Sequence, residues 1–221
     1  MSDFSTARQK MVDGQVRTSD VTDHRILDAM LAMPREDFVP EERRALAYLD
    51  LALDVGADGS KRFLIAPMLT AKLLQAAEIG PTDSVLIVGC ATGYMAALAA
   101  RLAAKVVATE SDSVLAAKGR EIMSKLGLQE AVTIETADAI AGFPSRAPFD
   151  VIILNGATEI APDELYRQLA EGGRLVGVFS SQRPSRAVIV TRSHGDFGHR
   201  LLFDASTPIL PGLERRPAFV F

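Results

Sequence analysis

After Pro81, short apolar runs rich in β-branched residues alternate with stretches whose apolar residues have helical spacing. The apolar runs cover residues 84–88, 105–109, 131–136, 149–154 and 174–179, and the helical stretches cover residues 94–102, 113–126 and 163–169. Strands that alternate with helices of about ten residues form βαβ units, in which helices cover both faces of a parallel sheet. We therefore expect an α/β fold with a mostly parallel, doubly wound sheet. Residues 187–191 and 201–203 are expected to add antiparallel strands.

The chain before Pro81 has a different pattern. Apolar residues recur at helical spacing between residues 6 and 48, which predicts short helices in series, with Thr22 or Asp23 capping the second. Periodicity is lost over residues 49–67, where we expect a loop, and a helix resumes over residues 68–77. We expect a single domain over residues 1–221, in which residues 1–77 form N-terminal helices and a substrate-loop region and residues 78–221 form the core.

Composition restricts the partners of the chain. Its 221 residues include 24 Lys and Arg and 28 Asp and Glu, a net charge of −4, and contain no run of basic residues. No nucleic acid is therefore expected as a partner. Cys90 is the only cysteine, which excludes an intramolecular disulfide and a cysteine-built zinc site, and we predict no metal. The polar N-terminus and the lack of a long apolar stretch favour a cytoplasmic protein that does not enter a membrane.

The strongest chemical signal is an apolar run, Val85 to Val88, that leads directly into a turn of small residues and then a helix. Gly89 and Gly93 in this turn allow the backbone to approach a ligand closely, and the helix offers unpaired N–H groups. Glu110 follows Gly89 by 21 positions, at the end of the second strand, where a carboxylate can accept hydrogen bonds from ribose hydroxyls. Two simpler interpretations stay open: Gly93 could permit close packing of helix and strand, and Glu110 could be a solvated charge.

The glycine spacing selects among nucleotide-like ligands. A dinucleotide site expects G-x-G-x-x-G and a P-loop expects G-K-[ST], and this turn has neither. A ligand with a ribose and no pyrophosphate fits, and S-adenosylmethionine (SAM) is the common one. Asp138 ends the third strand run, where it could bind the adenine amino group or cap a turn, and Asn155 ends the fourth. We predict a SAM site formed by Gly89, Cys90, Ala91, Gly93, Glu110, Asp138, Ala139 and Asn155.

Motifs along nearly the whole chain resemble those of one family. They include residues 11–12, 15–17, 22–23, 25–27, 29–30, 34–35 and 38–40 in the helical part, and residues 89–94, 110, 137–138, 148–150, 152–153 and 172–176 beyond it. In these motifs the chain resembles the protein-L-isoaspartate O-methyltransferases, which use SAM to methylate the abnormal carboxylate of isoaspartyl residues in damaged proteins. The resemblance implies a Rossmann-like methyltransferase fold, a role in protein repair, and isoaspartyl proteins or peptides as substrate.

The chain departs from the family at three positions. Ile87 stands where the family places an acid two residues before the first glycine, and Ala91 replaces the middle glycine. We expect right-handed backbone at Ala91, which would tolerate a methyl group. The family loop T-I-S-x-P reads Phe63 to Pro67 here, so that Ile65 stands at the serine position.

These departures leave the catalytic residue unassigned. An isoaspartyl carboxylate has a pKa of about 4, so at neutral pH it is an ionised nucleophile that needs no general base, only positioning. Positioning could fall on Ser60, on backbone N–H groups, or on no group. Lys61 and Arg62 could attract an anion or be exposed loop cations. The alternatives to the family activity are a non-catalytic binding or interaction protein and a methyltransferase with a different, more apolar substrate.

Overall fold

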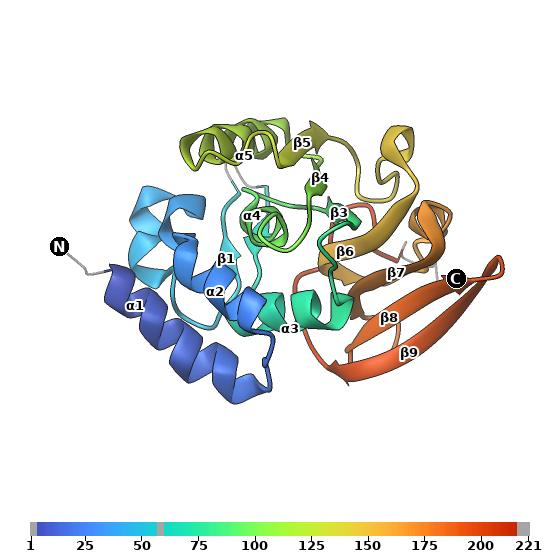
Figure 1. Ribbon diagram of the computed structural model, residues 1–221, viewed down its shortest axis with the longest axis horizontal. Coiled ribbons are helices and arrows are strands. Elements are labelled where there is room, and N and C mark those ends of the chain that lie inside the picture. The colour runs from blue at the N-terminus through green and yellow to red at the C-terminus, as the bar shows by residue number, and fades with distance from the viewer. Residues whose placement is uncertain (1–3, 57–59, 216–221) are drawn as a thin grey trace, which may run out of the picture.

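A computed structural model of the protein describes residues 4–56 and 60–215. Among these residues, seven strands form one sheet in the order β5-β4-β3-β6-β7-β8-β9 (Figure 1). The strands are β3 Ser84–Val88, β4 Lys105–Glu110, β5 Val132–Thr136, β6 Phe149–Thr158, β7 Leu169–Phe179, β8 Arg186–Ser193 and β9 Asp196–Asp204. The pairs from β5 to β7 are parallel, and β8 and β9 add antiparallel strands. The expected α/β fold with a mostly parallel sheet is confirmed.

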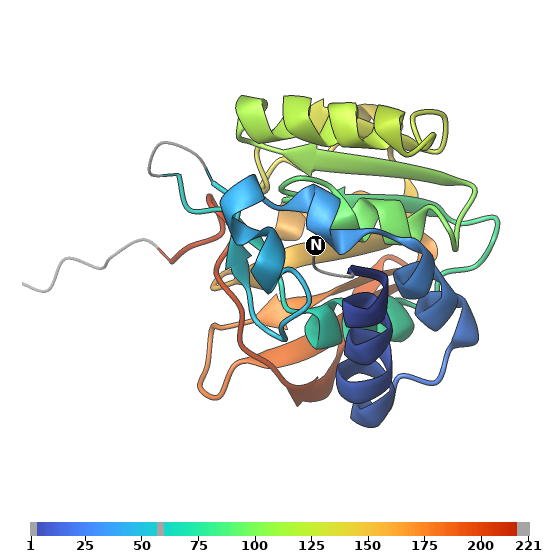
Figure 2. The same cartoon turned by 90° about the vertical axis from the view of Figure 1, so that its left-hand side faces the viewer.

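Helices cover both faces of this sheet. They are α1 Phe4–Met11, α2 His24–Ala32, α3 Pro67–Ala77, α4 Tyr94–Ala99, α5 Ser113–Lys125 and α6 Asp163–Tyr166, with short 3₁₀ or π turns at Val12–Val16, Arg17–Ser19, Arg35–Phe38, Glu41–Leu46 and Pro144–Arg146. Apolar side chains of α3, α4 and α5 share one buried cluster with those of the N-terminal helices, and α6 packs in a second cluster on the opposite face. Figure 2 looks from the side of the N-terminal helices, which lie in front of the sheet.

The central strand β3 is buried on both sides. Val85 and Ile87 pack in the cluster with α3, α4 and α5, whereas Leu86 and Val88 pack in the cluster on the other face. Side chains alternate along a strand, so an uninterrupted apolar run is what a strand covered on both faces requires. β3 pairs with β4 on one side and with β6 on the other, all three parallel. The carboxyl ends of these strands therefore lie together at one edge of the sheet.

Several boundaries differ from the sequence-based expectation. The region expected as a loop contains a two-stranded antiparallel ribbon of β1 Leu53–Asp54 and β2 Phe63–Leu64. Strands of two residues have no periodicity, and they form here because Leu53 and Leu64 are buried against the rest of the fold. Helix α4 ends at Ala99 rather than at residue 102, and α6 ends at Tyr166, so that β7 begins five residues earlier than expected.

Strand β6 continues to Thr158, so the prediction that Asn155 ends this strand was wrong. The register of β6 against β7 shifts between Ile153 and Ala157, and Asn155 lies within this irregular segment. Beyond the shift, Ala157 and Thr158 pair with β7, and a later segment of the chain pairs with the other side of the strand: the N–H of Leu210 donates to the carbonyl oxygen of Ala157. A partner that is more than fifty residues away in sequence leaves no local signal.

Candidate functional site

The loop Gly89 to Gly93 leaves the sheet at the point where the strand order reverses, between β4 and β6. Ligands of open α/β sheets bind outside the carboxyl ends of the strands at such a switch point. Gly89 has φ +70° and Gly93 has φ +96°, both in the left-handed region that glycine adopts without strain. Ala91 has φ +52°, so the expectation of right-handed backbone there was wrong. The loop keeps its left-handed conformation although a methyl group replaces hydrogen.

Cys90 lies inside this loop and is completely buried. Burial raises the pKa of its thiol well above the ordinary value, and the nearby Glu110 carboxylate adds to the effect. Its N–H donates to the carbonyl oxygen of Thr109 on β4, at 2.8 Å. Cys90 therefore fills space and anchors the loop to β4, with a thiol that stays protonated at neutral pH.

Glu110 ends β4, and its side chain is completely buried. One carboxylate oxygen accepts the N–H of Ala91 at 2.8 Å, which ties the acid to the glycine loop. The other oxygen accepts the N–H of Asp112 at 3.0 Å and the Nε–H of Arg62 at 2.7 Å. The side chain of Arg62 is 13% exposed, and its Nη2 also donates to the Ser111 hydroxyl at 2.6 Å. Arg62 is thus a half-buried partner of Glu110 rather than an exposed loop cation.

A late segment of the chain covers the other side of the loop. Leu210 is 5% exposed, and a Cβ placed on Gly89 would lie 2.4 Å from its Cδ2. The same side chain lies against Gly156, where an added Cβ would be 2.7 Å from the Leu210 Cγ. Asn155 is buried beside them, and its Nδ2 donates to the carbonyl oxygen of Gly89 at 2.8 Å. Sequence reasoning missed Leu210 because an apolar residue after the last strand is not distinctive.

The positions at which the chain departs from the family lie at different depths. Ile65 is 1% exposed and lines a small cavity together with Gly89, Asn155 and Arg62. Ile87 is completely buried among apolar side chains and does not line this cavity. The Ser60 hydroxyl donates to the carboxylate of Asp112 at 3.0 Å and so is engaged at the start of α5.

Asp138 and Ala139 follow the end of β5. Asp138 is exposed and its carbonyl oxygen accepts the N–H of Ala141 at 3.1 Å, whereas Ala139 is buried on the face of the sheet that carries α6. Strand β5, the neighbour of β4, ends at Thr136, so the prediction that Asp138 ends this strand was wrong: Asp138 lies two residues beyond it. The structure therefore brings Ala91 and Glu110 into direct contact, joins Gly89 to Asn155, and places Asp138 at the same sheet edge. The roles of these residues in binding remain predictions.

The space at the loop is small for the ligand that the family uses. The cavity lined by Arg62, Ile65 and Gly89 measures about 10 Å³, whereas ligand pockets usually measure about 300–1,000 Å³. The groups at the strand ends fit a nucleoside in kind, since a buried carboxylate and a glycine cradle lie side by side. The volume above them is taken by Arg62 and Leu210.

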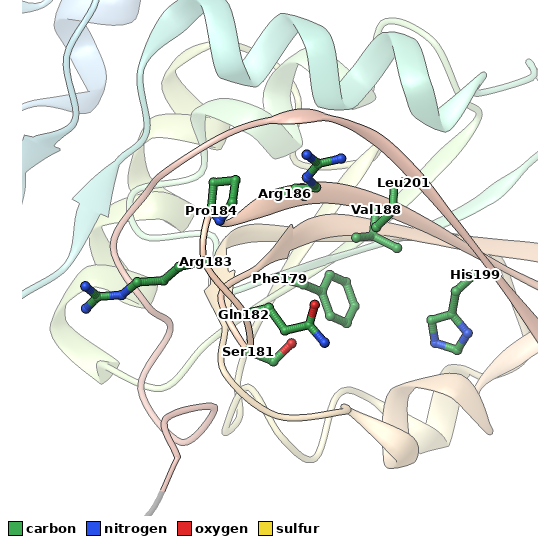
Figure 3. Close-up of a pocket in the computed structure, with 9 residues that line it drawn as sticks. All are labelled: Phe179, Ser181, Gln182, Arg183, Pro184, Arg186, Val188, His199 and Leu201. Atoms are coloured by element: carbon green, nitrogen blue, oxygen red, sulfur yellow. The ribbon is translucent and has the colours of Figure 1, made fainter.

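A larger cavity of about 410 Å³ lies on the antiparallel part of the sheet, among Phe179, Arg183, Val188 and His199 (Figure 3). Figure 3 shows Arg183 pointing away from the other labelled side chains. No residue predicted for the SAM site lines this cavity. Within residues 4–56 and 60–215, no cluster of His, Cys, Asp and Glu has the arrangement of a metal site. Over the same residues, no helix has the length and apolar character needed to cross a bilayer.

Comparison with known proteins identifies relatives over almost the whole chain. The sequence matches the family model of protein-L-isoaspartate(D-aspartate) O-methyltransferase over residues 6–198. The protein-L-isoaspartate O-methyltransferase of Koribacter versatilis is 37% identical over 219 residues, which cover 99% of this chain and 97% of that protein. The protein of the same name from Methylorubrum populi is 39% identical over 170 residues, which cover 77% of this chain and 78% of that protein.

Solved structures agree on the fold. A protein-L-isoaspartate O-methyltransferase superimposes with a TM-score of 0.83 at 24% identity, over 94% of this chain and 67% of that one. A Plasmodium falciparum structure described as a protein of this kind in complex with S-adenosyl-L-homocysteine has a TM-score of 0.79 at 18% identity, over 92% of this chain and 97% of that one. Together, the glycine loop at the switch point, the acid that ends β4 and the match over residues 6–198 show that the chain belongs to the protein-L-isoaspartate(D-aspartate) O-methyltransferase family, whose cofactor is SAM.

Proposed function

We propose that this chain transfers a methyl group from SAM to the side-chain carboxylate of isoaspartyl residues in damaged proteins and peptides. The observation that carries the proposal is the family match over residues 6–198, which includes both the helical part and the sheet. A fold shared with methyltransferases in general would support only the cofactor class. The match to the helical part supports the substrate class as well, because those motifs belong to this family.

Each predicted residue has a task in this proposal. When bound, SAM supplies a methyl group on a positively charged sulfur. Gly89, Cys90, Ala91 and Gly93 give the cofactor a close approach to the backbone, and Glu110 accepts hydrogen bonds from the ribose hydroxyls. Asp138, beside Ala139, accepts a hydrogen bond from the adenine amino group. Asn155 holds the carbonyl of Gly89 and so fixes the start of the loop.

The substrate carboxylate needs positioning rather than activation. It is ionised at neutral pH, so no residue has to remove a proton from it. An ionised group is unfavourable next to Ile65 unless hydrogen-bond donors surround it. Backbone N–H groups outside the glycine loop serve this purpose in the proposal, because the Ser60 hydroxyl already donates to Asp112 and the N–H groups of Cys90, Ala91 and Gly93 are already engaged within the fold. Because no side-chain hydroxyl positions the carboxylate, we expect a slow enzyme. We place it in the cytoplasm.

The direct test is incubation of the purified full-length protein with methyl-labelled SAM and a peptide that contains one isoaspartyl residue. We expect a base-labile methyl ester, and no ester with the matched peptide that contains a normal aspartyl residue. Glu110→Gln should lower kcat/KM for SAM at least about tenfold, because it removes the charged acceptor for the ribose. Glu130→Gln, at an exposed position, is the matched control. No ester at equimolar enzyme and peptide would contradict the proposal.

A further inference from the structure

Two segments from distant parts of the sequence close over the glycine loop. Residues 60–65 approach from the side of β4, and residues 206–213 approach from the side of β6. Figure 2 shows the corresponding cyan and red segments at the same edge of the molecule. The first segment contributes Arg62 and the second contributes Leu210. The cavity of about 10 Å³ between them is what is left of the space above Gly89.

Arg62 donates a hydrogen bond to the carboxylate of Glu110, which the proposed function assigns to the ribose hydroxyls. Its Nε lies 2.7 Å from a Glu110 carboxylate oxygen, and its Nη2 lies 2.6 Å from the Ser111 hydroxyl. The guanidinium is therefore held by the last residue of β4 and by the residue that follows it. The carboxylate has no exposed surface, and the guanidinium side chain is 13% exposed. Charge-assisted hydrogen bonds are among the strong ones in proteins, and water screens this pair little. Ribose hydroxyls and Arg62 cannot both occupy this face of Glu110.

Leu210 closes the glycine cradle in a complementary way. Its side chain lies where Cβ atoms on Gly89 and Gly156 would lie. The space that the two glycines leave is therefore filled by a side chain of the protein itself. Backbone hydrogen bonds hold this segment to β6, since the N–H of Ala157 donates to the carbonyl oxygen of Pro208 and the N–H of Leu210 donates to that of Ala157. The segment is thus held to the last residues of β6 by backbone hydrogen bonds.

We propose that Arg62 and Leu210 form an internal latch that holds the cofactor site closed, with Arg62 occupying the place of the ribose hydroxyls and Leu210 occupying the glycine cradle. The inference rests on the proposed function, which assigns Glu110 to the ribose. Nucleoside binding then requires the Arg62 to Glu110 contact to break and residues 206–213 to shift. The latch and the nucleoside compete for the same atoms, so each weakens the binding of the other.

The competition has a measurable size. When only a fraction of the molecules is open, the apparent dissociation constant equals the intrinsic constant divided by that fraction. If the latch keeps about one molecule in ten open, its removal tightens binding about tenfold. Arg62→Met removes the guanidinium and keeps an apolar side chain of similar length. Leu210→Ala opens the cradle without touching Glu110, and we expect it to tighten binding independently.

The experiment is isothermal titration of the full-length protein with S-adenosyl-L-homocysteine, which binds without reacting. We expect Arg62→Met to bind about tenfold or more tightly than the unsubstituted protein. Arg167→Met is the matched control, because it removes an arginine whose side chain is 65% exposed and paired with Glu164. Leu165→Ala, a buried leucine on α6, is the control for Leu210→Ala. Both controls should leave the affinity unchanged.

Thermal unfolding of each variant shows that it is folded, and Leu210→Ala carries the test if Arg62→Met does not fold. Tighter binding by the latch variants and not by the controls supports the latch. If the unsubstituted protein binds and the latch variants bind no more tightly, the latch is overturned and the proposed methyl transfer stands. If neither the unsubstituted protein nor any variant binds, both the latch and the assignment of SAM to this site are overturned.

Discussion

Single side chains set the polarity of the site. Ile65 is buried beside Gly89 and Asn155, at the position where the family carries a serine. Its carbonyl oxygen accepts a hydrogen bond from Arg35, so the backbone at this point is fixed and only the side chain differs in chemistry. A branched apolar group there excludes water and offers no hydrogen bond to a carboxylate. We therefore expect this side chain to affect the binding of a carboxylate substrate.

We predict that Ile65→Ser raises the rate of isoaspartyl methylation, because a hydroxyl at this position can donate to the substrate carboxylate. The same change should lower the free energy of unfolding by about 2–4 kcal/mol, since it truncates a buried isoleucine. Initial rates of ester formation and urea denaturation measure the two effects. Ile65→Ala is the matched control, because it opens the same space without a hydroxyl. An unchanged or lower rate in Ile65→Ser would show that this side chain does not face the substrate.

Among the elements, the start of α5 is joined to residues 60–65 through Asp112. Asp112 caps α5 by accepting the N–H groups of Val114 and Leu115, and it also accepts the Ser60 hydroxyl. Burial acts to raise the pKa of the Asp112 carboxyl, but these hydrogen bonds and the nearby Arg62 outweigh burial and hold the pKa below its ordinary value. The ionised form is thus the one that the fold stabilises.

The cap predicts a pH-dependent contribution to stability. Asp112→Ala should lower the free energy of unfolding at pH 7 by about 1 kcal/mol, the usual effect of losing an N-cap. Because the pKa is depressed in the folded state, the charge-dependent part is fully present above the unfolded pKa of about 3.9 and is lost as the pH falls through the folded pKa. Urea denaturation between pH 7 and pH 2.5 should therefore show the difference from the unsubstituted protein shrinking below about pH 4. A difference that stays constant would exclude a role for the charge.

At the scale of the whole molecule, Arg35 joins the N-terminal helices to the site. It is completely buried, and its guanidinium donates to the carbonyl oxygens of Ala47 and Ile65, at 2.8 Å each. The same group lies 4.7 Å from the centre of the Tyr94 ring, at the start of α4. Burial lowers the pKa of Arg35 below its ordinary value, although the neighbouring Tyr94 acts in the opposite direction. One side chain thus connects the helical part, the loop at Ile65 and the helix after the glycine loop.

We predict that Arg35→Met lowers the free energy of unfolding by about 2–4 kcal/mol, because the buried carbonyl oxygen of Ala47 loses its donor and that of Ile65 keeps only the longer bond from the Thr70 hydroxyl, at 3.5 Å. We also propose that residues 1–77 and 78–221 unfold as one unit, since their apolar side chains share a cluster. Far-UV circular dichroism and tyrosine fluorescence should therefore report the same urea midpoint in both proteins. Arg101→Met, at an exposed position, should change the stability by less than about 0.5 kcal/mol. Two separate transitions would contradict the single unit.

Much of the fold follows from local patterns. The apolar run before Gly89 predicts a strand buried on both faces, and the alternation of strands with helices predicts a parallel sheet, because both depend on side-chain periodicity within a few residues. The proximity of Gly89 and Glu110 is also predictable, since neighbouring parallel strands end at the same edge of a sheet. The short ribbon of β1 and β2 and the extension of β6 are not predictable in this way, because distant burial and distant pairing stabilise them.

The sheet, the glycine loop and the acid at the end of β4 follow from the sequence, because each is encoded by residues that are neighbours in the chain or stand at a spacing set by one βαβ unit. The groups that face this acid depend on the folded chain. Arg62 lies 48 positions before Glu110, and Leu210 lies 121 positions after Gly89. Their contacts exist because chain folding brings both segments to the switch point, where a buried carboxylate requires a donor and an empty apolar cradle favours an apolar side chain.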